Sequence, residues 1–466
     1  MHIRFARVFF NLKFILILSV LLRVGAALYL GDEAISLPGT ADQVSYHHLA
    51  VRVLEGHGFS FEQAWWPMTG AGEPTAHWSF LYTLYLVLCY SLFGINPLAA
   101  RLIQAILVGI LHPYLAYRLA DAAFGGFPAI GEVLRRRIAL FTALLTGIYI
   151  YFIYYSVTLM TEPFFIASVL ATLLATIILA QRISEPGYWR VAILLGFSIA
   201  VSVLLRQLFL LFVPILFLWL AFAAYRQFHL KRALISIPIA GFILLLAILP
   251  ITYYNYVRFQ RFVLINTNAG YVLFWANHPI HGTKFISAAE MGDTYQELVP
   301  DDLRSLDEAA LDQELLRRGL QFIVDDPGRY GLLSLSRIAA YFKFWPDPSS
   351  GAISNISRVG SFGLLLPFIL YGLLRPLIYQ RRMTTRSFLS IMATPLALLY
   401  VFILFFTLIH ILTWALVRYR LPVDAVLIAY AGLSFAELSG YLQRRRDRRR
   451  RGISEHSTMV SDWTPG

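Results

Sequence analysis

The chain is poor in cysteine and in charged residues. Cys89 is the one cysteine among 466 residues, which excludes an internal disulfide and any site built from several thiolates. Charged residues make up 14% of the chain, against about a quarter in soluble proteins, whereas 58% of its residues are hydrophobic. Phosphate-binding P-loops and dinucleotide-binding glycine motifs are also absent from the sequence. This composition excludes an ordinary soluble nucleotide-dependent enzyme and indicates a membrane protein.

Acidic residues are scarce as well. The sequence holds 27 Asp and Glu against 39 Lys and Arg, which gives a net charge of +12. The basic residues lie in short gaps between apolar runs, for example at Arg135–Arg137 and Arg444–Arg451. Because cytoplasmic loops of membrane proteins are enriched in Lys and Arg, topology explains the excess without a nucleic-acid partner. The terminal run can also contact anionic lipid headgroups, although a stop-transfer anchor is the preferred explanation.

Long apolar runs predict ten membrane-spanning helices, since about 20 mostly apolar residues cross a bilayer. The expected spans are 12–30, 97–119, 138–156, 162–181, 189–206, 207–225, 233–252, 359–378, 387–412 and 422–440. The apolar run at 78–93 is expected at the membrane surface, because another crossing would move Arg135–Arg137 to the wrong side. The predicted fold is an all-α integral membrane bundle of about ten spans, with interfacial helices and two large extracytoplasmic loops.

Two segments between spans are too long to be simple connectors. We call residues 31–96 the first long loop and residues 253–358 the second long loop. In the first, an amphipathic pattern over 42–55 predicts a surface helix, which ends at the following glycines. In the second, the charged stretch 300–329 predicts water-soluble helices, and the apolar stretch 330–345 predicts a return to the interface.

The expected organisation follows from these segments and from the basic gaps. An N-terminal membrane module, 1–252, contains the first long loop and precedes the second. C-terminal membrane helices at 359–443 and a basic cytoplasmic tail at 444–466 complete the chain. The distribution of Lys and Arg places both termini in the cytoplasm of a cell with the chain in its inner (plasma) membrane, and both long loops on the opposite face.

Six ionisable residues are expected near the extracytoplasmic ends of the spans. Insertion of a charge into a bilayer costs about 2.5–3.5 kcal/mol, so such residues need a partner, water or a nearby surface. Each also has a plain structural explanation, such as stabilising a helix start or reaching the headgroups. These residues are Asp42, Glu162, Arg206, Lys343, Arg418 and Arg420.

Histidines in the first long loop invite comparison with metal sites. Their spacing matches no specific zinc pattern, so no metal ligand is assigned, although a divalent metal remains an open alternative. No other cofactor is indicated. The histidines are His47, His48, His57 and His77.

Several short patterns, in a fixed order, resemble membrane glycosyltransferases of the C-type superfamily, and protein mannosyltransferases and aminoarabinose transferases in particular. The first long loop carries Asp42, then Tyr46 and Ala50 at intervals of four, then Gly56–Phe59. The resemblance continues along nearly the whole chain. It includes Phe93–Gly94, Arg101, Thr161–Glu162, Leu205–Arg206, Asn266–Gly270, Asn277–Pro279, Asp326–Tyr330 and Arg418–Pro422.

The resemblance implies a sugar donor linked to a polyprenyl phosphate and an acceptor glycan, lipid or protein on the extracytoplasmic face. Asp42 would be the catalytic base, with Tyr46 and His278 lining the site. Many relatives carry Asp-Glu at this point, whereas this chain has Gln43 after Asp42. This substitution removes the second acid that a metal or an acceptor would use.

Elementary chemistry agrees with this reading. Glycosyl transfer needs a carboxylate to take the acceptor proton and cations to stabilise the departing phosphate, with inversion at the sugar as the natural outcome. Asp42 can supply the carboxylate, with Glu162 beside it. Arg418, Arg420, Arg206 and Lys343 are the candidate phosphate-binding residues, because guanidinium groups match phosphate oxygens.

Two other functions are compatible with a polytopic membrane protein. A transporter or flippase of lipid-linked saccharides would also have many spans and internal charges, but it typically carries paired halves and charges near the midplane. A non-catalytic scaffold would explain the long loops but gives no reason for the clustered charges. Sugar transfer is therefore the preferred hypothesis.

Overall fold

The computed structural model describes residues 11–127, 130–286, 294–348, 350–382 and 388–461. In these ranges the chain forms helices, and its only strand-like pairings are two isolated bridges. Nine helical segments of the described chain are long and apolar enough to cross a membrane. The expected all-α polytopic membrane fold is therefore confirmed. The helices of these segments are α2 (Leu12–Leu30), α5 (Pro97–Gly125), α8 (Glu162–Gln181), α9 (Tyr188–Leu205), α10 (Val213–Tyr225), α11 (Leu230–Phe259), α18 (Leu364–Arg382), α20 (Pro395–Leu412) and α21 (Leu421–Ser461).

The span expected at 138–156 is not one continuous helix. It is split into α6 (Glu132–Ile148) and α7 (Ile150–Tyr155) at Tyr149, whose backbone is extended. Arg23 of α2 is fully buried beside the break and donates a hydrogen bond of 2.8 Å to the carbonyl of Gly147. The break frees carbonyls at the end of α6 for this buried guanidinium, a tertiary contact that apolar periodicity does not reveal.

The start of another span also differs from its prediction. Residue 387 lies outside the described residues, and α20 begins only at Pro395, after the short helix α19 (Phe388–Met392). The Thr394 side chain accepts a hydrogen bond from the backbone of Ala397, and Pro395 occupies the first turn. This combination of capping residue and proline is a typical helix start. Residues 462–466 of the expected tail also lie outside the described residues.

Several further elements, apart from the helices of the two long loops, are short. They are the 3₁₀-helices η1 (Gln207–Leu211), η2 (Pro279–His281), η3 (Asp301–Leu303) and η5 (Val417–Arg420), the α-helices α14 (Thr294–Glu297) and α17 (Ala352–Arg358), and the π-helix η4 (Val359–Gly363).

The first long loop contains the two helices expected there. Helix α3 (Asp42–Leu54) ends before Gly56, whose φ of 85° favours glycine. Helix α4 (Phe80–Phe93) starts at Ser79, whose hydroxyl accepts a hydrogen bond from the backbone of Tyr82. With 14 residues, α4 is too short to cross a bilayer, in agreement with its predicted place at the surface.

The second long loop contributes α12 (Ala269–Asn277), α15 (Glu308–Asp325) and α16 (Pro327–Tyr341). Helices α12 and α15 cross so closely that a Cβ at Gly270 would lie 1.8 Å from the backbone oxygen of Asp312. A Cβ at Gly319 would lie 2.7 Å from the α12 backbone. These two glycines are therefore required by backbone contact.

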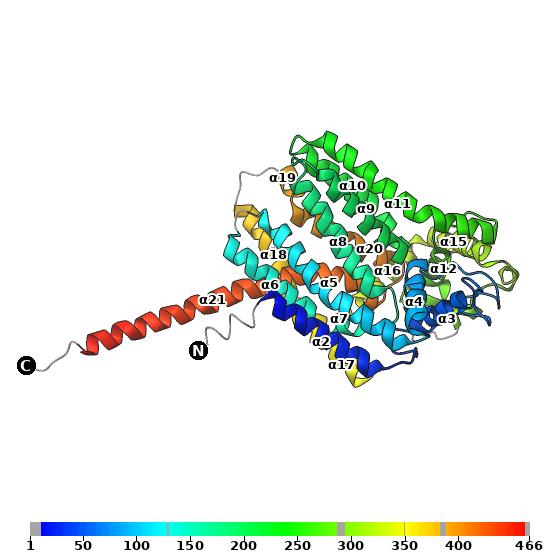
Figure 1. The fold of residues 1–466 in the computed structure, drawn as a ribbon, viewed down its shortest axis with the longest axis horizontal. Helices are drawn as coiled ribbons and strands as arrows, with labels where there is room; N and C mark the ends of the chain where they lie inside the picture. Colours follow the sequence, from blue (N-terminus) through cyan, green and yellow to red (C-terminus); the bar gives the residue numbers. More distant parts are fainter. Residues whose placement is uncertain (1–10, 128–129, 287–293, 349, 383–387, 462–466) are drawn as a thin grey trace, which may run out of the picture.

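One carboxylate joins the two long loops. Glu308, the first residue of α15, is buried and accepts hydrogen bonds from Thr69 Oγ1 at 2.7 Å and the backbone of Ala76 at 2.8 Å. Thr267 Oγ1 donates to the same carboxylate at 2.5 Å. In Figure 1, α3, α4, α12 and α15 gather at the end of the bundle away from the point where α21 leaves it. The two long loops thus form one cap on the bundle.

Candidate functional site

Asp42 is placed by the tight turn that precedes α3. The Thr40 hydroxyl donates to the carbonyl of Leu37 at 3.1 Å, and the backbone of Leu37 donates back to this hydroxyl at 3.2 Å. Asp42 then occupies the first turn of α3, where the helix dipole stabilises a negative charge. Its side chain remains 27% exposed, the most accessible of the four charged groups that meet here.

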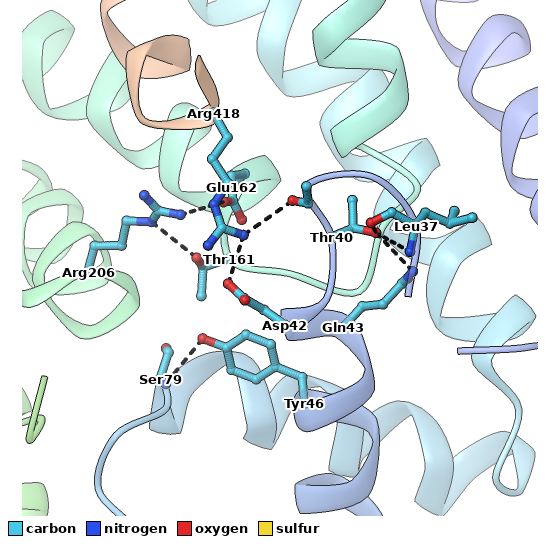
Figure 2. Close-up of polar contacts among 11 residues, drawn as sticks. Leu37, Thr40, Asp42, Gln43, Tyr46, Ser79, Thr161, Glu162, Arg206 and Arg418 are labelled. Carbon is cyan, nitrogen blue, oxygen red and sulfur yellow. Dashed lines mark hydrogen bonds and ion pairs between the residues drawn. The ribbon is translucent and has the colours of Figure 1, made fainter. Parts of the chain in front are cut away.

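Arg418 reaches Asp42 from a distant part of the chain. It lies in the 3₁₀ turn η5, and its Nη1 is 2.8 Å from Asp42 Oδ2. The same nitrogen donates to the carbonyl of Gly39 at 3.3 Å, and Nε lies 3.8 Å from Glu162 Oε1. Figure 2 shows the guanidinium between the two carboxylates. Residues more than 370 positions apart thus make the centre of the candidate site.

Arg206 holds Glu162 from the other side. Glu162 is the first residue of α8 and Arg206 follows the last residue of α9, so both side chains leave helix ends. Arg206 Nη2 lies 2.5 Å from Glu162 Oε1, and Arg206 Nε donates to Thr161 Oγ1 at 3.2 Å. Together with Asp42 and Arg418, these residues form a chain of alternating charges, which we call the charge cluster (Figure 2). Its formal charge is zero.

An aromatic residue that the sequence analysis did not single out supports both arginines. The Tyr419 ring centroid lies 5.1 Å from the Arg206 guanidinium and 5.3 Å from that of Arg418. His410 of α20 stacks on the same ring with centroids 5.0 Å apart. Cation–π attraction fixes the two guanidinium planes. In the sequence Tyr419 lies between Arg418 and Arg420. Its contact with Arg206 depends on the tertiary structure.

Gln43, the residue after Asp42, ties the start of α3 to the bundle. Its Oε1 accepts from Arg101 Nη2 at 3.2 Å, and its Nε2 donates to Thr40 Oγ1 at 3.3 Å. Arg101 itself donates to the carbonyls of Gly31 at 2.6 Å and Glu33 at 2.7 Å. A neutral amide both donates and accepts, whereas a carboxylate only accepts. Gln43 thus positions Asp42 by linking the turn before α3 to Arg101 of α5.

Tyr46 lies one turn after Asp42, as the spacing of four predicts. Its hydroxyl accepts a hydrogen bond from the backbone of Ser79 at 3.3 Å, and its ring meets those of Trp78 and Tyr82 edge-on. Burial, with the nearby charge of Asp42, raises the pKa of the Tyr46 hydroxyl above its usual range. The Tyr46 hydroxyl therefore stays protonated. Figure 2 shows its ring beneath Asp42.

Three of the predicted site residues lie in other surroundings. Arg420 is fully buried and bonds to Asp424 at 2.9 Å and to the carbonyl of Tyr341 at 2.9 Å. Lys343 forms an ion pair with Asp347, four residues along the chain. His278 packs edge-on against the rings of Phe274 and Phe322 at the end of α12. The structure thus brings Asp42, Tyr46, Glu162, Arg206 and Arg418 together.

The histidines of the first long loop do not form a metal-binding group. Among the residues that the structure describes, no three His, Cys, Asp or Glu side chains lie close enough to hold an ion. His47 Nδ1 instead lies 2.9 Å from the hydroxyl of Tyr90. Burial lowers the pKa of His47 to about 4, with the charges of His48 and Arg101 acting in the same direction.

The charge cluster leaves some of its polar atoms unused. Glu162 Oε2 and Arg418 Nε are buried and lack a hydrogen-bond partner in the described part of the chain, as does Trp78 Nε1 nearby. Buried polar atoms are usually paired, so unpaired ones mark a place that a polar ligand can complete. Chemically, the arrangement offers an accessible carboxylate beside a guanidinium, which suits proton transfer next to an anion.

Comparison with known proteins gives similarity at the level of the fold. No protein-family model and no curated protein matches the chain. Among solved structures, the apo oligosaccharyltransferase of Archaeoglobus fulgidus matches with a TM-score of 0.56 and 15% identity, over 94% of this chain and 52% of that one. The same enzyme, AglB, in complex with an inhibitory peptide and a dolichol-phosphate, matches with a TM-score of 0.56 and 16% identity, over 94% and 51%.

A weaker match links the chain to ArnT from Cupriavidus metallidurans bound to undecaprenyl phosphate. Its TM-score is 0.40 and its identity 15%, over 90% of this chain and 75% of that one. The chain thus spans about half the length of the oligosaccharyltransferase with which it shares its fold. The helical bundle with its cap therefore shares the fold of the archaeal oligosaccharyltransferase.

Proposed function

We propose that the chain is an integral membrane glycosyltransferase that moves a sugar from a polyprenyl-phosphate-linked donor to an acceptor glycan, lipid or protein. The observation that carries the proposal is the contact of 2.8 Å between Asp42 and Arg418 at the capped end of the bundle. The fold shared with an oligosaccharyltransferase captured with a dolichol-phosphate supports the class of donor. The distribution of basic residues supports an extracytoplasmic site in the inner membrane.

In the proposed reaction, Asp42 takes the proton of the acceptor hydroxyl. The acceptor oxygen bonds to the anomeric carbon as the bond from that carbon to the donor phosphate breaks, and the bonding electrons leave with the phosphate. Arg418, with Arg206 behind Glu162, stabilises the charge on that phosphate. A single displacement of this kind inverts the sugar.

Because the charge cluster is neutral overall, Arg418 can also control the charge of Asp42. Without donor, its guanidinium neutralises Asp42 at 2.8 Å, and its Nε lacks a hydrogen-bond partner among the described residues. A donor phosphate would draw Arg418 from Asp42 and leave that carboxylate free to accept a proton. Donor binding would thus activate the base. The other four predicted residues have supporting roles. Tyr46 holds the Asp42 carboxylate in place, Arg420 holds the η5 turn, and Lys343 and His278 hold the cap.

The transporter alternative is less well supported. Glu162 begins α8, Arg206 follows α9, and Arg418 lies just before α21, so the charges occupy helix ends. Charges that serve transport are usually found near the membrane midplane. The position of the cluster therefore favours chemistry at a membrane surface.

The deciding experiment is a transfer assay with the full chain in lipid vesicles. A mixed panel of polyprenyl-phosphate sugars and a membrane extract as acceptor source are added, and donor and products are followed by mass spectrometry. Asp42→Asn should lower sugar release by on the order of 10² or more, because the amide cannot take the proton. Glu33→Gln is the matched control, since this exposed acid lies in the same loop but outside the charge cluster.

The outcomes separate the two functions. Equal release by wild type and Asp42→Asn would remove Asp42 from the mechanism. If donor lipids move to the other leaflet and keep their sugar, the result would support the transporter and contradict the glycosyltransferase.

A further inference from the structure

A groove lies on the bundle far from the charge cluster. It has a volume of about 980 Å³ and runs between the start of α6, residues 367–379 of α18 and the middle of α21. Helix α21 begins beside the charge cluster, and Glu437–Arg444 lie 16 to 23 residues further on. At 1.5 Å per residue, this part of the groove is about 24–35 Å from the start of α21. Figure 1 shows α6 and α18 toward the end where α21 leaves the bundle.

The floor of the groove is apolar and open to the surroundings. Phe368 stacks on Phe435 with ring centroids 4.2 Å apart, and Pro367 lies beside it in the lining. Val133 and Leu438, also in the lining, are 70% and 43% exposed. Such a surface at the end of a membrane bundle suits a hydrocarbon chain.

One carboxylate in the groove is already neutralised. Glu437 lies 3.1 Å from Arg375 Nε and accepts hydrogen bonds from the hydroxyls of Tyr371 at 2.6 Å and Tyr379 at 2.8 Å. The other acid, Glu132, lies in the first turn of α6, where the helix dipole stabilises its charge. Neither acid forms an ion pair with the arginines at the end of the groove, within the described residues.

Two arginines converge at that end. A Cβ at Gly440 would lie 3.5 Å from Arg444 Nη1 and 3.6 Å from Arg137 Nη1, so both guanidinium groups face one point. Arg137 also donates to Gln443 Oε1 at 2.8 Å. In the described part of the chain, neither guanidinium has a carboxylate partner. Two cations held this close repel each other unless an anion lies between them.

We propose that this groove binds an anionic phospholipid. The lipid phosphate lies between Arg137 and Arg444, since two guanidinium groups can share its oxygens, and an acyl chain lies along Phe368 and Leu438. The absence of a side chain at Gly440 lets both guanidinium groups lie close to the α21 backbone at this point. The volume falls within the roughly 300–1,000 Å³ usual for small-molecule sites. This site is separate from the proposed donor site in ligand and in place.

The test uses the purified full chain and native mass spectrometry with phosphatidylglycerol, and with phosphatidylcholine as the neutral probe. Wild type should retain phosphatidylglycerol in preference. The double variant Arg137→Gln, Arg444→Gln should bind it about tenfold or more weakly, because each arginine near an anionic lipid surface adds to the attraction. The matched control, Arg182→Gln with Arg190→Gln, removes the same charge elsewhere and should bind like wild type. Arg182 pairs with Glu185 outside the groove.

A second variant separates the groove from the basic run that follows it. Gly440→Leu keeps every charge but fills the point that the arginines face, so it should also lose phosphatidylglycerol. Unchanged binding by Gly440→Leu, or an equal loss in the control, would overturn the groove and assign the effect to general surface charge. Equal retention of phosphatidylcholine would overturn the anionic specificity. Lipid retention is measured without sugar transfer, so the result is independent of the proposed reaction.

Discussion

Arg418 and Arg420 differ in surroundings although they are two positions apart. Arg418 keeps 13% of its side chain exposed and meets Asp42, whereas Arg420 is buried against Asp424 and over the Phe362 ring at 3.7 Å. Both lie in η5, a 3₁₀ turn with three residues per turn, so side chains two positions apart point in different directions. The sequence pattern predicts an arginine pair with one role, while the turn gives each arginine its own.

Substitution should separate these roles. Arg418→Gln should raise the apparent donor KM by about tenfold with little change in thermal stability, because it removes one charged contact to the donor phosphate. Arg420→Gln should lower the unfolding free energy by about 3–5 kcal/mol, since Asp424 is left buried without its cation. Donor titrations and thermal unfolding of the purified variants measure both effects. A stable Arg420→Gln protein with a raised donor KM would show that Arg420 contacts donor.

Among the elements, α12 and α15 cross at two glycines, and Gly270 makes the closer approach. Gly270→Ala should destabilise the second long loop by about 1–3 kcal/mol or more, because its methyl group would lie 1.8 Å from the Asp312 backbone oxygen. Limited proteolysis within residues 253–358 and thermal unfolding measure the loss. Gly331→Ala in α16 is the control: no atom lies within 4 Å of its Cβ, so helix propensity should leave it neutral or slightly stabilised. Equal behaviour of the two variants would contradict the close crossing.

The same crossing should depend on pH through Asp312. Burial raises the pKa of Asp312 to about 7, although hydrogen bonds from Gly270 and Tyr271 favour its charged form. Because an unfolded Asp titrates near 3.9, the folded state binds the proton more tightly between the two values. Stability should therefore fall as pH rises from about 4 to about 7, by up to about 1.4 kcal/mol per pH unit.

Asp312→Asn should remove this slope, since Asn keeps an oxygen that accepts the Gly270 hydrogen bond of 2.8 Å. Thermal midpoints of both proteins between pH 5 and 8 measure the difference. Parallel pH profiles would mean that Asp312 does not carry the dependence.

At the scale of the whole molecule, Glu308 should keep the two long loops together. Glu308→Ala would leave Thr69, Thr267 and the backbone of Ala76 without their acceptor, at a cost of at least about 1–3 kcal/mol for the buried groups. The cap should then open, and a protease should cut both long loops faster. Glu314→Ala on the same helix is the control, because its ion pair with Arg317 is exposed and contributes little. Unchanged cleavage of Glu308→Ala would show that Glu308 does not hold the two long loops together.

Apolar runs and local capping residues are enough to predict the membrane surroundings of this protein and most of its helices. Apolar runs of about 20 residues are long enough to span a bilayer, and a local capping signal such as Ser79 sets a helix start through a contact a few residues away. Asp42 and Glu162 could be singled out for a related reason, since a charge near membrane depth is costly unless it has a use.

Which charged residues meet depends on the packing of the helices. Arg418 contacts Asp42 across more than 370 positions, Tyr419 joins two arginines, and Glu308 connects separate loops. At the break before Tyr149, the carbonyl of Gly147 likewise accepts a hydrogen bond from the buried Arg23 of another helix. Each of these contacts depends on the packing of elements that are distant in the chain, and local periodicity carries no information about such pairs.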